Sequence, residues 1–201
     1  MSDDGAVDDA DNADNADGVV DDAGHVDHVD HVDHVDHVLA QWAAQFPELD
    51  ASPMAIVGRV KRLARIVESN LNATFQAHGL DAPSFDVLAT LRRSPPPHRL
   101  TPAELMRATM VTSGAVTQRL DRLEERGLVT RTRRAEDARS FHVSLSPEGL
   151  ALINKAMLDN VITQNRLLSG LGPAQRDELA GGLRALLESL GDTPPPPPGK
   201  P

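Results

Sequence analysis

Residues 100–144 decide the fold of this chain, and they read LTPAELMRATMVTSGAVTQRLDRLEERGLVTRTRRAEDARSFHVS. The stretch opens with a helix start. Thr101 can cap the first free amides, Pro102 sits in the first turn where its missing N–H costs nothing, and Glu104 can bond back to the cap residue. The helix that begins here is predicted to be short, because a second cap signal follows at residues 112–113.

A second helix is predicted from residues 112–113 to about Arg126. It ends at Gly127, since glycine is the usual residue at a left-handed helix exit. Helical spacing places three apolar side chains on one face, which is predicted to be buried: Val116, Leu120 and Leu123. The other faces carry polar side chains, so the helix presents hydrogen-bonding groups outward.

The hydrophobic period changes after this helix. Residues 128–130 and 141–143 are short runs of strand-forming residues. The loop predicted between them, residues 131–139, is basic and contains Arg131, Arg133, Arg134 and Arg139. Two helices followed by a basic hairpin predict a mainly α fold with a small β-wing, a winged helix-turn-helix over residues 81–145.

This order of elements favours double-stranded DNA as a partner. A helix in the major groove needs small polar side chains near the base edges and cations for phosphates, and an arginine-rich loop can enter the minor groove. The candidate contacts are Thr112, Ser113, Thr117, Gln118 and Arg122 on the helix, with Arg133, Arg134 and Arg139 in the wing. The alternative is an ordinary amphipathic helix with a charged hairpin. Three acidic residues partly neutralise the helix: Asp121, Glu124 and Glu125.

The charge of the chain is divided unevenly. The net charge is −10, which by itself disfavours a DNA partner. Residues 1–53 contain fifteen acidic residues and no Lys or Arg, whereas residues 54–201 contain twenty basic and fifteen acidic residues. The folded part is therefore predicted to be basic. The chain has no cysteine, which excludes disulfides and cysteine metal sites, and it shows neither a signal peptide nor a membrane span. A cytoplasmic protein is expected.

The N-terminal segment has two parts. Residues 1–24 are rich in Asp, Ala and Asn and are predicted to be disordered. Residues 25–38 repeat a His-Val-Asp triplet, with His25, His28, His31, His34 and His37. These imidazoles are weak candidates for binding zinc or nickel. A low-complexity expansion is the favoured alternative, because a period of three drifts around an α-helix.

Helices are predicted on both sides of the winged region. An extra N-terminal helix starts near Val35 and contains Trp42, the one tryptophan. A long helix from about Met54 to His78, ended by Gly79, has a continuous apolar stripe: Ile56, Val60, Leu63, Val67, Leu71 and Phe75. Its length exceeds what a small winged domain can cover, which favours a dimer interface.

Three more helices complete the expected architecture. One opens at Ala82-Pro83 and directs Phe85, Leu88 and Leu91 to the core. After the wing, residues 146–149 start a helix with a stripe of Leu150, Ile153, Met157, Val161 and Leu168. A last helix follows with Leu179, Leu183, Leu186, Leu187 and Leu190. The predicted organisation is a disordered acidic and His-rich tail (1–34), an extra helix and linker (35–53), dimerisation helices (54–80 and 146–190), the winged region (81–145) and a proline-rich disordered tail (191–201).

Residues 54–190 resemble the multiple-antibiotic-resistance regulator (MarR) family. The most specific pieces are ERGLV at residues 125–129 and the wing signature Asp137-Ala138-Arg139. The resemblance implies that Asp137 braces the wing, that Arg139 reaches the minor groove, and that the protein is a homodimer binding a palindromic operator as a repressor. No cofactor is implied beyond a small-molecule effector.

A narrower resemblance, to the urate-responsive branch of that family, concerns the effector. Its members have an additional N-terminal helix and Trp, Asp, Arg and Arg at positions that correspond here to Trp42, Asp86, Arg119 and Arg131. An anionic purine suits an aromatic wall, two guanidinium groups and one carboxylate. The hypothesis is that Asp86 pairs with Arg119 in the free protein and that the ligand breaks this pair and tilts the helix that reads DNA.

Other interpretations stay open. Each of the four residues has an ordinary structural explanation, the effector could be a phenolic acid or a drug-like aromatic, and the protein could be a ligand-independent architectural DNA-binding protein. An enzyme is not expected, because no nucleophile triad, phosphate loop or carboxylate pair is present. Three histidines near helix ends or strands have no predicted catalytic partners: His78, His98 and His142.

Overall fold

The computed structural model describes residues 32–96, 98–108, 116–133 and 141–192, with the backbone alone described at residues 116 and 117. The chain divides into two compact units, residues 1–55 and 56–201, and each is described by itself. The first contains α1 (His34–Gln45) and the start of α2 (Ser52–Ala77). The second contains the rest of α2 and all later elements.

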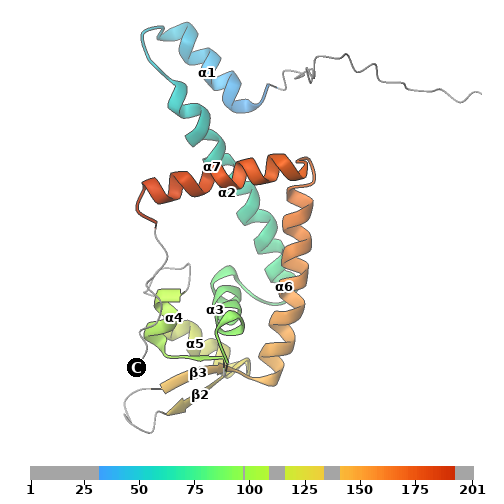
Figure 1. Ribbon diagram of the computed structural model, residues 1–201. Helices are drawn as coiled ribbons and strands as arrows, with labels where there is room; N and C mark the ends of the chain where they lie inside the picture. The colour runs from blue at the N-terminus through green and yellow to red at the C-terminus, as the bar shows by residue number, and fades with distance from the viewer. Residues whose placement is uncertain (1–31, 97, 109–115, 134–140, 193–201) are drawn as a thin grey trace, which may run out of the picture. The chain divides into compact units, whose positions relative to one another are not determined.

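The second unit follows the predicted order of helices and strands (Figure 1). After α2 come α3 (Ala82–Arg93), β1 (Arg99–Leu100), α4 (Pro102–Ala108), α5 (Val116–Glu125), β2 (Val129–Arg133), β3 (Phe141–Leu145), α6 (Pro147–Leu167) and α7 (Pro173–Ser189). In this unit α4, α5 and the sheet lie near the start of α6, and α7 follows its other end. No helix among the described residues is both long and apolar enough to cross a membrane.

The helix boundaries come from the predicted caps. At α4, Thr101 N donates to Glu104 Oε2 over 2.7 Å and Glu104 N donates to Thr101 Oγ1 over 3.2 Å, which is the predicted reciprocal cap. Ser146 Oγ accepts from Gly149 N over 2.9 Å at the start of α6. Gly127 adopts a φ of 68° just after α5, which confirms the predicted left-handed exit.

Within the described ranges the sheet has three strands rather than the predicted two. Its antiparallel order is β1-β3-β2, and β1 adds two residues to the hairpin through the pair Arg99 and Ser144. Two residues are too few to show a period in the sequence. The loop was also predicted to start too early: Arg131 and Arg133 pair with Val143 and Phe141, so they lie on β2.

The core of the second unit lies between α3, α5, α6 and the sheet. Leu88 and Leu91 of α3 and Leu120 of α5 are fully buried, as predicted. These side chains meet others of the same kind in one cluster, including Leu105, Leu123, Val143 and Ile153. The predicted inner face of α5 is therefore confirmed at the two positions whose side chains are described.

The apolar stripe predicted for α6 is only partly buried in the single chain. Ile153 is fully buried, but three other members are 39–46% exposed: Leu150, Val161 and Leu168. The buried face instead continues through small and polar residues, Ala156, Asn160 and Thr163. They allow close packing, and Thr163 Oγ1 lies 2.8 Å from Thr74 Oγ1 on α2.

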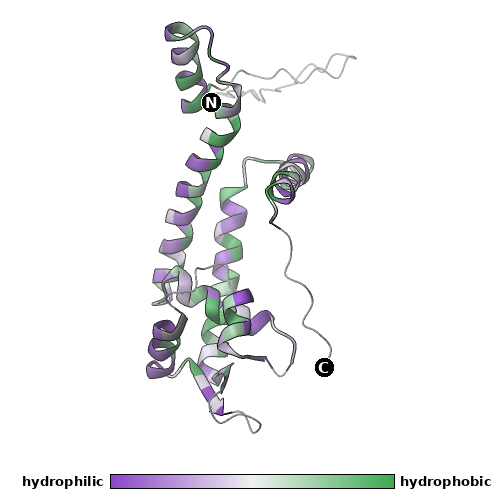
Figure 2. Ribbon diagram, turned by 90° about the vertical axis from the view of Figure 1, so that its left-hand side faces the viewer, coloured by the Kyte–Doolittle hydropathy of each residue, from purple (hydrophilic) through white to green (hydrophobic). Residues whose placement is uncertain are grey.

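The stripes predicted on α2 and α7 remain largely uncovered. Phe75, at the end of α2, is buried and stacks on Phe85 with ring centroids 4.1 Å apart. Earlier members of the same stripe are 37–62% exposed: Ile56, Val60, Leu63 and Val67. Figure 2 shows apolar residues recurring along α2, and α7 has no buried residue. These helices carry more apolar surface than the single chain covers.

Candidate nucleic-acid and effector sites

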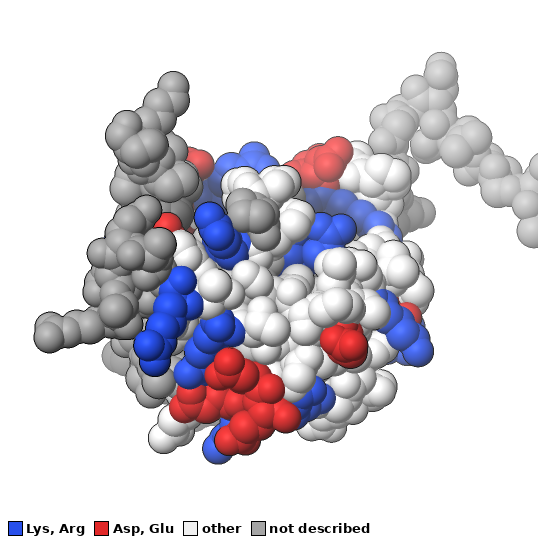
Figure 3. Space-filling view, turned by 90° about the horizontal axis from the view of Figure 1, so that it is seen from below, with Lys and Arg blue, Asp and Glu red and all other residues white. Residues whose placement is uncertain are grey.

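The inner face of helix α5 is buried in the core, and its outer face is exposed to solvent. Leu120 and Leu123 anchor it in the core, while Gln118, Asp121 and Arg122 are exposed. Gln118 and Arg122 were both predicted as DNA contacts. Figure 3 views the molecule from the end that carries the sheet, where Lys and Arg side chains are spread over the surface and an acidic cluster lies among them. The surface is thus mixed in charge.

Several predicted contacts lie outside the described residues: Thr112, Ser113, Arg134, Asp137 and Arg139. The backbone of Thr117 lies in the first turn of α5, and its side chain is not described. The histidines His25, His28 and His31 also lie outside. The described part of the wing therefore contributes Arg133, on the last residue of β2.

Five exposed arginines from β1 to β2 form no ion pair within the part of the chain that the structure describes. Arg122 and Arg133 were predicted, whereas the sequence reasoning did not single out Arg99, Arg107 and Arg126. None of the five has a carboxylate of the described residues within 4.0 Å, in contrast to Arg119 and Arg131 of the same region. Their elements contact one another, α4 with β1 and α5 and α5 with β2. We call these residues the unpaired arginines: Arg99, Arg107, Arg122, Arg126 and Arg133.

Arg131 ties β2 to α5. Its Nη2 donates to Asp121 Oδ1 over 2.5 Å. Its Nε lies 3.2 Å from Glu124 Oε2, which is an ion pair without the geometry of a hydrogen bond. The guanidinium also lies 5.0 Å from the centroid of the Phe141 ring. Two of the acidic residues that partly neutralise α5 are therefore already engaged by a cation from the sheet.

Arg119 pairs with Asp81, which corrects the predicted pair with Asp86. Arg119 Nη1 lies 2.6 Å from each carboxylate oxygen of Asp81 and 3.4 Å from Ser84 Oγ. Asp86 lies about 1.4 turns further along α3, where one of its oxygens is 3.9 Å from Arg93 Nη1. The N-cap residue of α3, which the sequence analysis did not consider, is the carboxylate that faces α5.

Asp81 has two roles at once. Its side chain accepts from Ser84 N over 2.8 Å and thereby caps α3 while it binds Arg119 of α5. Partial burial acts to raise the pKa of Asp81, but hydrogen bonds from Ser84 and Arg119 outweigh it and lower the pKa to about 2. Asp81 is therefore ionised throughout the physiological range. The Arg119 side chain is 15% exposed, so this ion pair is partly shielded from solvent.

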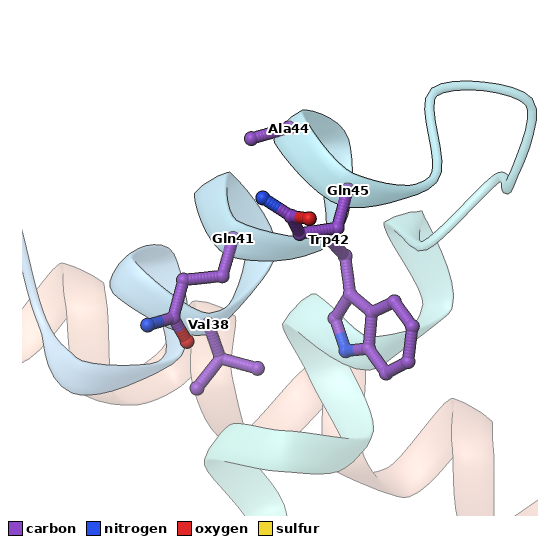
Figure 4. Close-up of a pocket in the computed structure, with 5 residues that line it drawn as sticks. All are labelled: Val38, Gln41, Trp42, Ala44 and Gln45. Carbon is purple, nitrogen blue, oxygen red and sulfur yellow. The ribbon is translucent and has the colours of Figure 1, made fainter.

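In the first unit, Trp42 is 41% exposed on α1. It lines a shallow depression with Val38, Gln41, Ala44 and Gln45, and Figure 4 shows Val38 and Trp42 extending to one side of the helix and Ala44 to the other. His34 and His37 are exposed on the same helix. No group of three or more His, Cys, Asp or Glu side chains within the described ranges could hold a metal ion.

The histidines considered for catalysis have structural partners that the sequence reasoning missed. His78 Nε2 lies 2.8 Å from Asp159 Oδ2 and joins the end of α2 to α6. His98 Nδ1 lies 2.6 Å from the carbonyl oxygen of Ser94 in the turn before β1. Both contacts join neighbouring segments of the scaffold, and neither brings a nucleophile beside the imidazole.

Comparison with known proteins identifies the family. The MarR family model matches residues 78–140. The HTH-type transcriptional regulator PecS of Dickeya dadantii (strain 3937) is 35% identical over 150 residues, which are 75% of this chain and 88% of PecS. The chain belongs to the MarR family.

Solved structures share the fold, among them that of a MarR-family regulator bound to DNA. Sco3205 of Streptomyces coelicolor, solved in complex with DNA, has a TM-score of 0.63 and 24% identity, covering 73% of this chain and 97% of that chain. BpsR of Bordetella bronchiseptica, whose DNA binding is regulated by 6-hydroxynicotinic acid, has a TM-score of 0.58 and 24% identity, with coverages of 65% and 91%. The mainly α architecture with a small antiparallel wing is therefore a fold that these solved structures share.

Proposed function

We propose that the protein is a transcriptional repressor that binds a palindromic DNA operator as a homodimer. The observation that carries this proposal is the exposure of the unpaired arginines around the anchored helix α5. Cations without internal partners release counterions when they contact phosphates, so they contribute directly to affinity for a duplex. The MarR-family membership and the DNA complex of Sco3205 support the same conclusion.

The homodimer is supported by the uncovered apolar surface of the helical layer. Four residues of the α2 stripe and the leucines of α7 are at least 37% exposed in the single chain. A second copy could cover them by a twofold contact, in which the same surface is used by both partners. Two copies of α5 would then face half-sites about one DNA turn apart, which fits a palindrome.

The proposed effector is an anionic aromatic molecule, with urate as the first choice. An anion can compete with Asp81 for Arg119, and Asp86 and Arg131 are then proposed to complete the site within the second unit. Loss of the Arg119–Asp81 pair would separate α5 from the cap of α3 and lower affinity for DNA. BpsR, regulated by an aromatic carboxylic acid, supports this ligand class. A role of Trp42 in effector binding remains a prediction from the sequence.

The test is a gel shift with DNA from upstream of the protein's own gene, with and without urate. We expect a discrete complex that urate releases, and its absence at all DNA concentrations would overturn the repressor proposal. A panel with a phenolic acid and 6-hydroxynicotinate separates the effector candidates. Arg119→Gln should remove the response to the true effector, whereas Arg184→Gln on α7 is the matched control. Binding that no compound changes would refute the effector proposal alone.

A further inference from the structure

Helix α4 is anchored at its start and in its middle by its own residues. The reciprocal cap of Thr101 and Glu104 holds the first turn, and Leu105 is fully buried in the core. The helix has seven residues and ends at Ala108. A helix this short is not stable alone, so its position depends on such contacts. Its last backbone carbonyl groups have no partner within the helix, as at every helix end.

The end of α4 is held by an arginine from another helix. Arg93, the last residue of α3, donates from Nη2 to the carbonyl oxygen of Ala108 over 2.6 Å. The carboxyl ends of α3 and α4 therefore lie within the reach of one side chain. Both ends carry partial negative charge from the helix dipoles, and a cation at this point reduces their repulsion. This contact joins α3 to the first helix of the helix-turn-helix.

The same guanidinium lies beside a residue of the proposed effector site. Arg93 Nη1 is 3.9 Å from Asp86 Oδ1, so one terminal nitrogen lies toward Asp86 while the other donates to the end of α4. The Arg93 side chain is 54% exposed, so the ion pair with Asp86 is weak. An anion bound next to Asp86 would therefore compete for the guanidinium at little cost.

We propose that Arg93 is a positioning residue that fixes the end of α4 for specific reading of DNA and transmits to that end the state of Asp86. The inference rests on the proposed function, because it assigns a route from the effector site to the helix-turn-helix. Helix α4 contacts α5, so a shift of its end changes where α5 meets the bases. Sequence-independent attraction to phosphates does not need that placement. Arg93 should therefore favour the operator over random DNA.

The first experiment compares Arg93→Gln with Arg92→Gln in the full-length chain. Arg92 is the matched control, because it precedes Arg93 on α3 and donates from Nε to Asn154 Oδ1 of α6 over 2.8 Å. Each variant thus loses one positive charge and one side-chain hydrogen bond. Fluorescence anisotropy measures the affinity of each protein for the operator found by the gel shift and for a random duplex, at several salt concentrations.

The expected result is a loss of discrimination in one variant alone. Arg93→Gln should lower the ratio of operator affinity to random-duplex affinity by roughly fivefold, the value of about one hydrogen bond. Arg92→Gln should leave this ratio unchanged, and the salt slope of log Kd on random duplex should be the same in both variants. A slope reduced by about 1 in Arg93→Gln alone would identify a phosphate contact and overturn the proposal. Equal ratios in both variants would overturn it as well.

The second experiment observes α4 without DNA. Hydrogen exchange measured by mass spectrometry reports the opening of residues 101–108. Exchange should be roughly fivefold faster in Arg93→Gln than in the natural chain and unchanged in Arg92→Gln. Arg93→Lys keeps a donor for the carbonyl oxygen of Ala108 and should restore most of the protection. Equal exchange in all four proteins would overturn the proposal. Faster exchange with an unchanged affinity ratio would also overturn it, because Arg93 would then stabilise α4 without placing it for DNA.

A double-mutant cycle tests the link to Asp86. Asp86→Asn should lower the affinity ratio by about twofold in the natural chain. It should have no effect in Arg93→Gln, because the side chain through which Asp86 acts is then absent. Losses that add in the double variant would overturn the link between Asp86 and the end of α4.

These outcomes separate the inference from the function on which it rests. If the natural chain and its variants bind no duplex, the proposed function fails, and hydrogen exchange still reports whether Arg93 fixes α4. If the natural chain binds its operator and Arg93→Gln behaves like Arg92→Gln, the repressor proposal stands and the role of Arg93 is refuted.

Discussion

Leucines are buried to very different degrees in two regions of this protein. We call α3, α4, α5 and the sheet the DNA-reading end, and α2 and α7 the helical layer. Around α3 and α5, Leu88, Leu91 and Leu120 have no exposed surface, and the core closes within one chain. On α7, Leu183 and Leu187 remain 42% and 49% exposed, and the helix has no buried residue. The core of the DNA-reading end closes within one chain, whereas the helical layer has apolar surface that a partner could cover. Substitutions at the first should therefore change the free energy of unfolding of the single chain, and substitutions at the second should change dimerisation.

The largest expected effect is on the closed core. Leu120→Ala removes a fully buried side chain and should lower the free energy of unfolding by about 3 kcal/mol. Urea unfolding monitored by circular dichroism measures it. The matched variant Leu183→Ala on α7 should change the stability of the dissociated chain by less than about 1 kcal/mol. Equal losses would show that α7 is packed within the single chain after all.

The next effect concerns the uncovered layer. Leu63→Asp on α2 should leave the fold intact, because that side chain is 51% exposed. If a partner covers it, the buried charge should weaken dimerisation by at least about 2 kcal/mol, roughly 30-fold. Light scattering after size exclusion reports the mass. A natural chain that is itself monomeric would contradict the proposed role of this surface.

A smaller effect is expected at the cap that joins α3 to α5. Asp81→Ala should cost about 1 kcal/mol of stability through the lost cap, and Asp81→Asn, which can still cap, isolates the pair with Arg119. Because folding lowers the pKa of Asp81 to about 2, its charge stabilises the fold above the ordinary value of 3.8. This contribution is lost as the pH falls toward 2.

Urea unfolding of the natural chain and Asp81→Asn from pH 7 to pH 2 tests this assignment. The difference between the two proteins should be constant near neutrality and should close between about pH 4 and pH 2. A difference that persists at pH 2 would mean that the ionised carboxylate of Asp81 does not stabilise the native state.

The smallest effect distinguishes two arginines of the reading end. Arg122→Gln should weaken binding to all duplexes alike and reduce the salt slope of log Kd by about 1, as expected for a phosphate contact. Arg131→Gln should leave the slope unchanged, because Arg131 is bound to Asp121 and Glu124. Its effect should appear instead as a loss of thermal stability. A slope change with Arg131→Gln would show that it leaves its carboxylates to contact DNA.

The sequence predicted the elements well where a local signal sets them. The cap at Thr101 and Glu104, the exit at Gly127 and the inner face of α5 depend on neighbours within a few residues. Partners that are distant in the sequence could not be predicted from such local signals. The choice of Asp81 over Asp86 by Arg119 depends on how α3 packs on α5, and no spacing rule encodes it.

The same limit applies to the missed features. Strand β1 is defined by its partner β3 rather than by its own two residues. The buried face of α6 runs through Asn160 and Thr163, which an apolar pattern does not count. His78 gained a carboxylate from a residue 81 positions away. Each of these follows from tertiary packing, which a single sequence does not display.

The short strand β1 limits how much the chain length can vary immediately before α4. Leu100 pairs with Val143, and the next residue, Thr101, already caps α4. An inserted residue at this junction would lose either the strand register or the cap. Natural or engineered length changes should therefore be rejected immediately before α4.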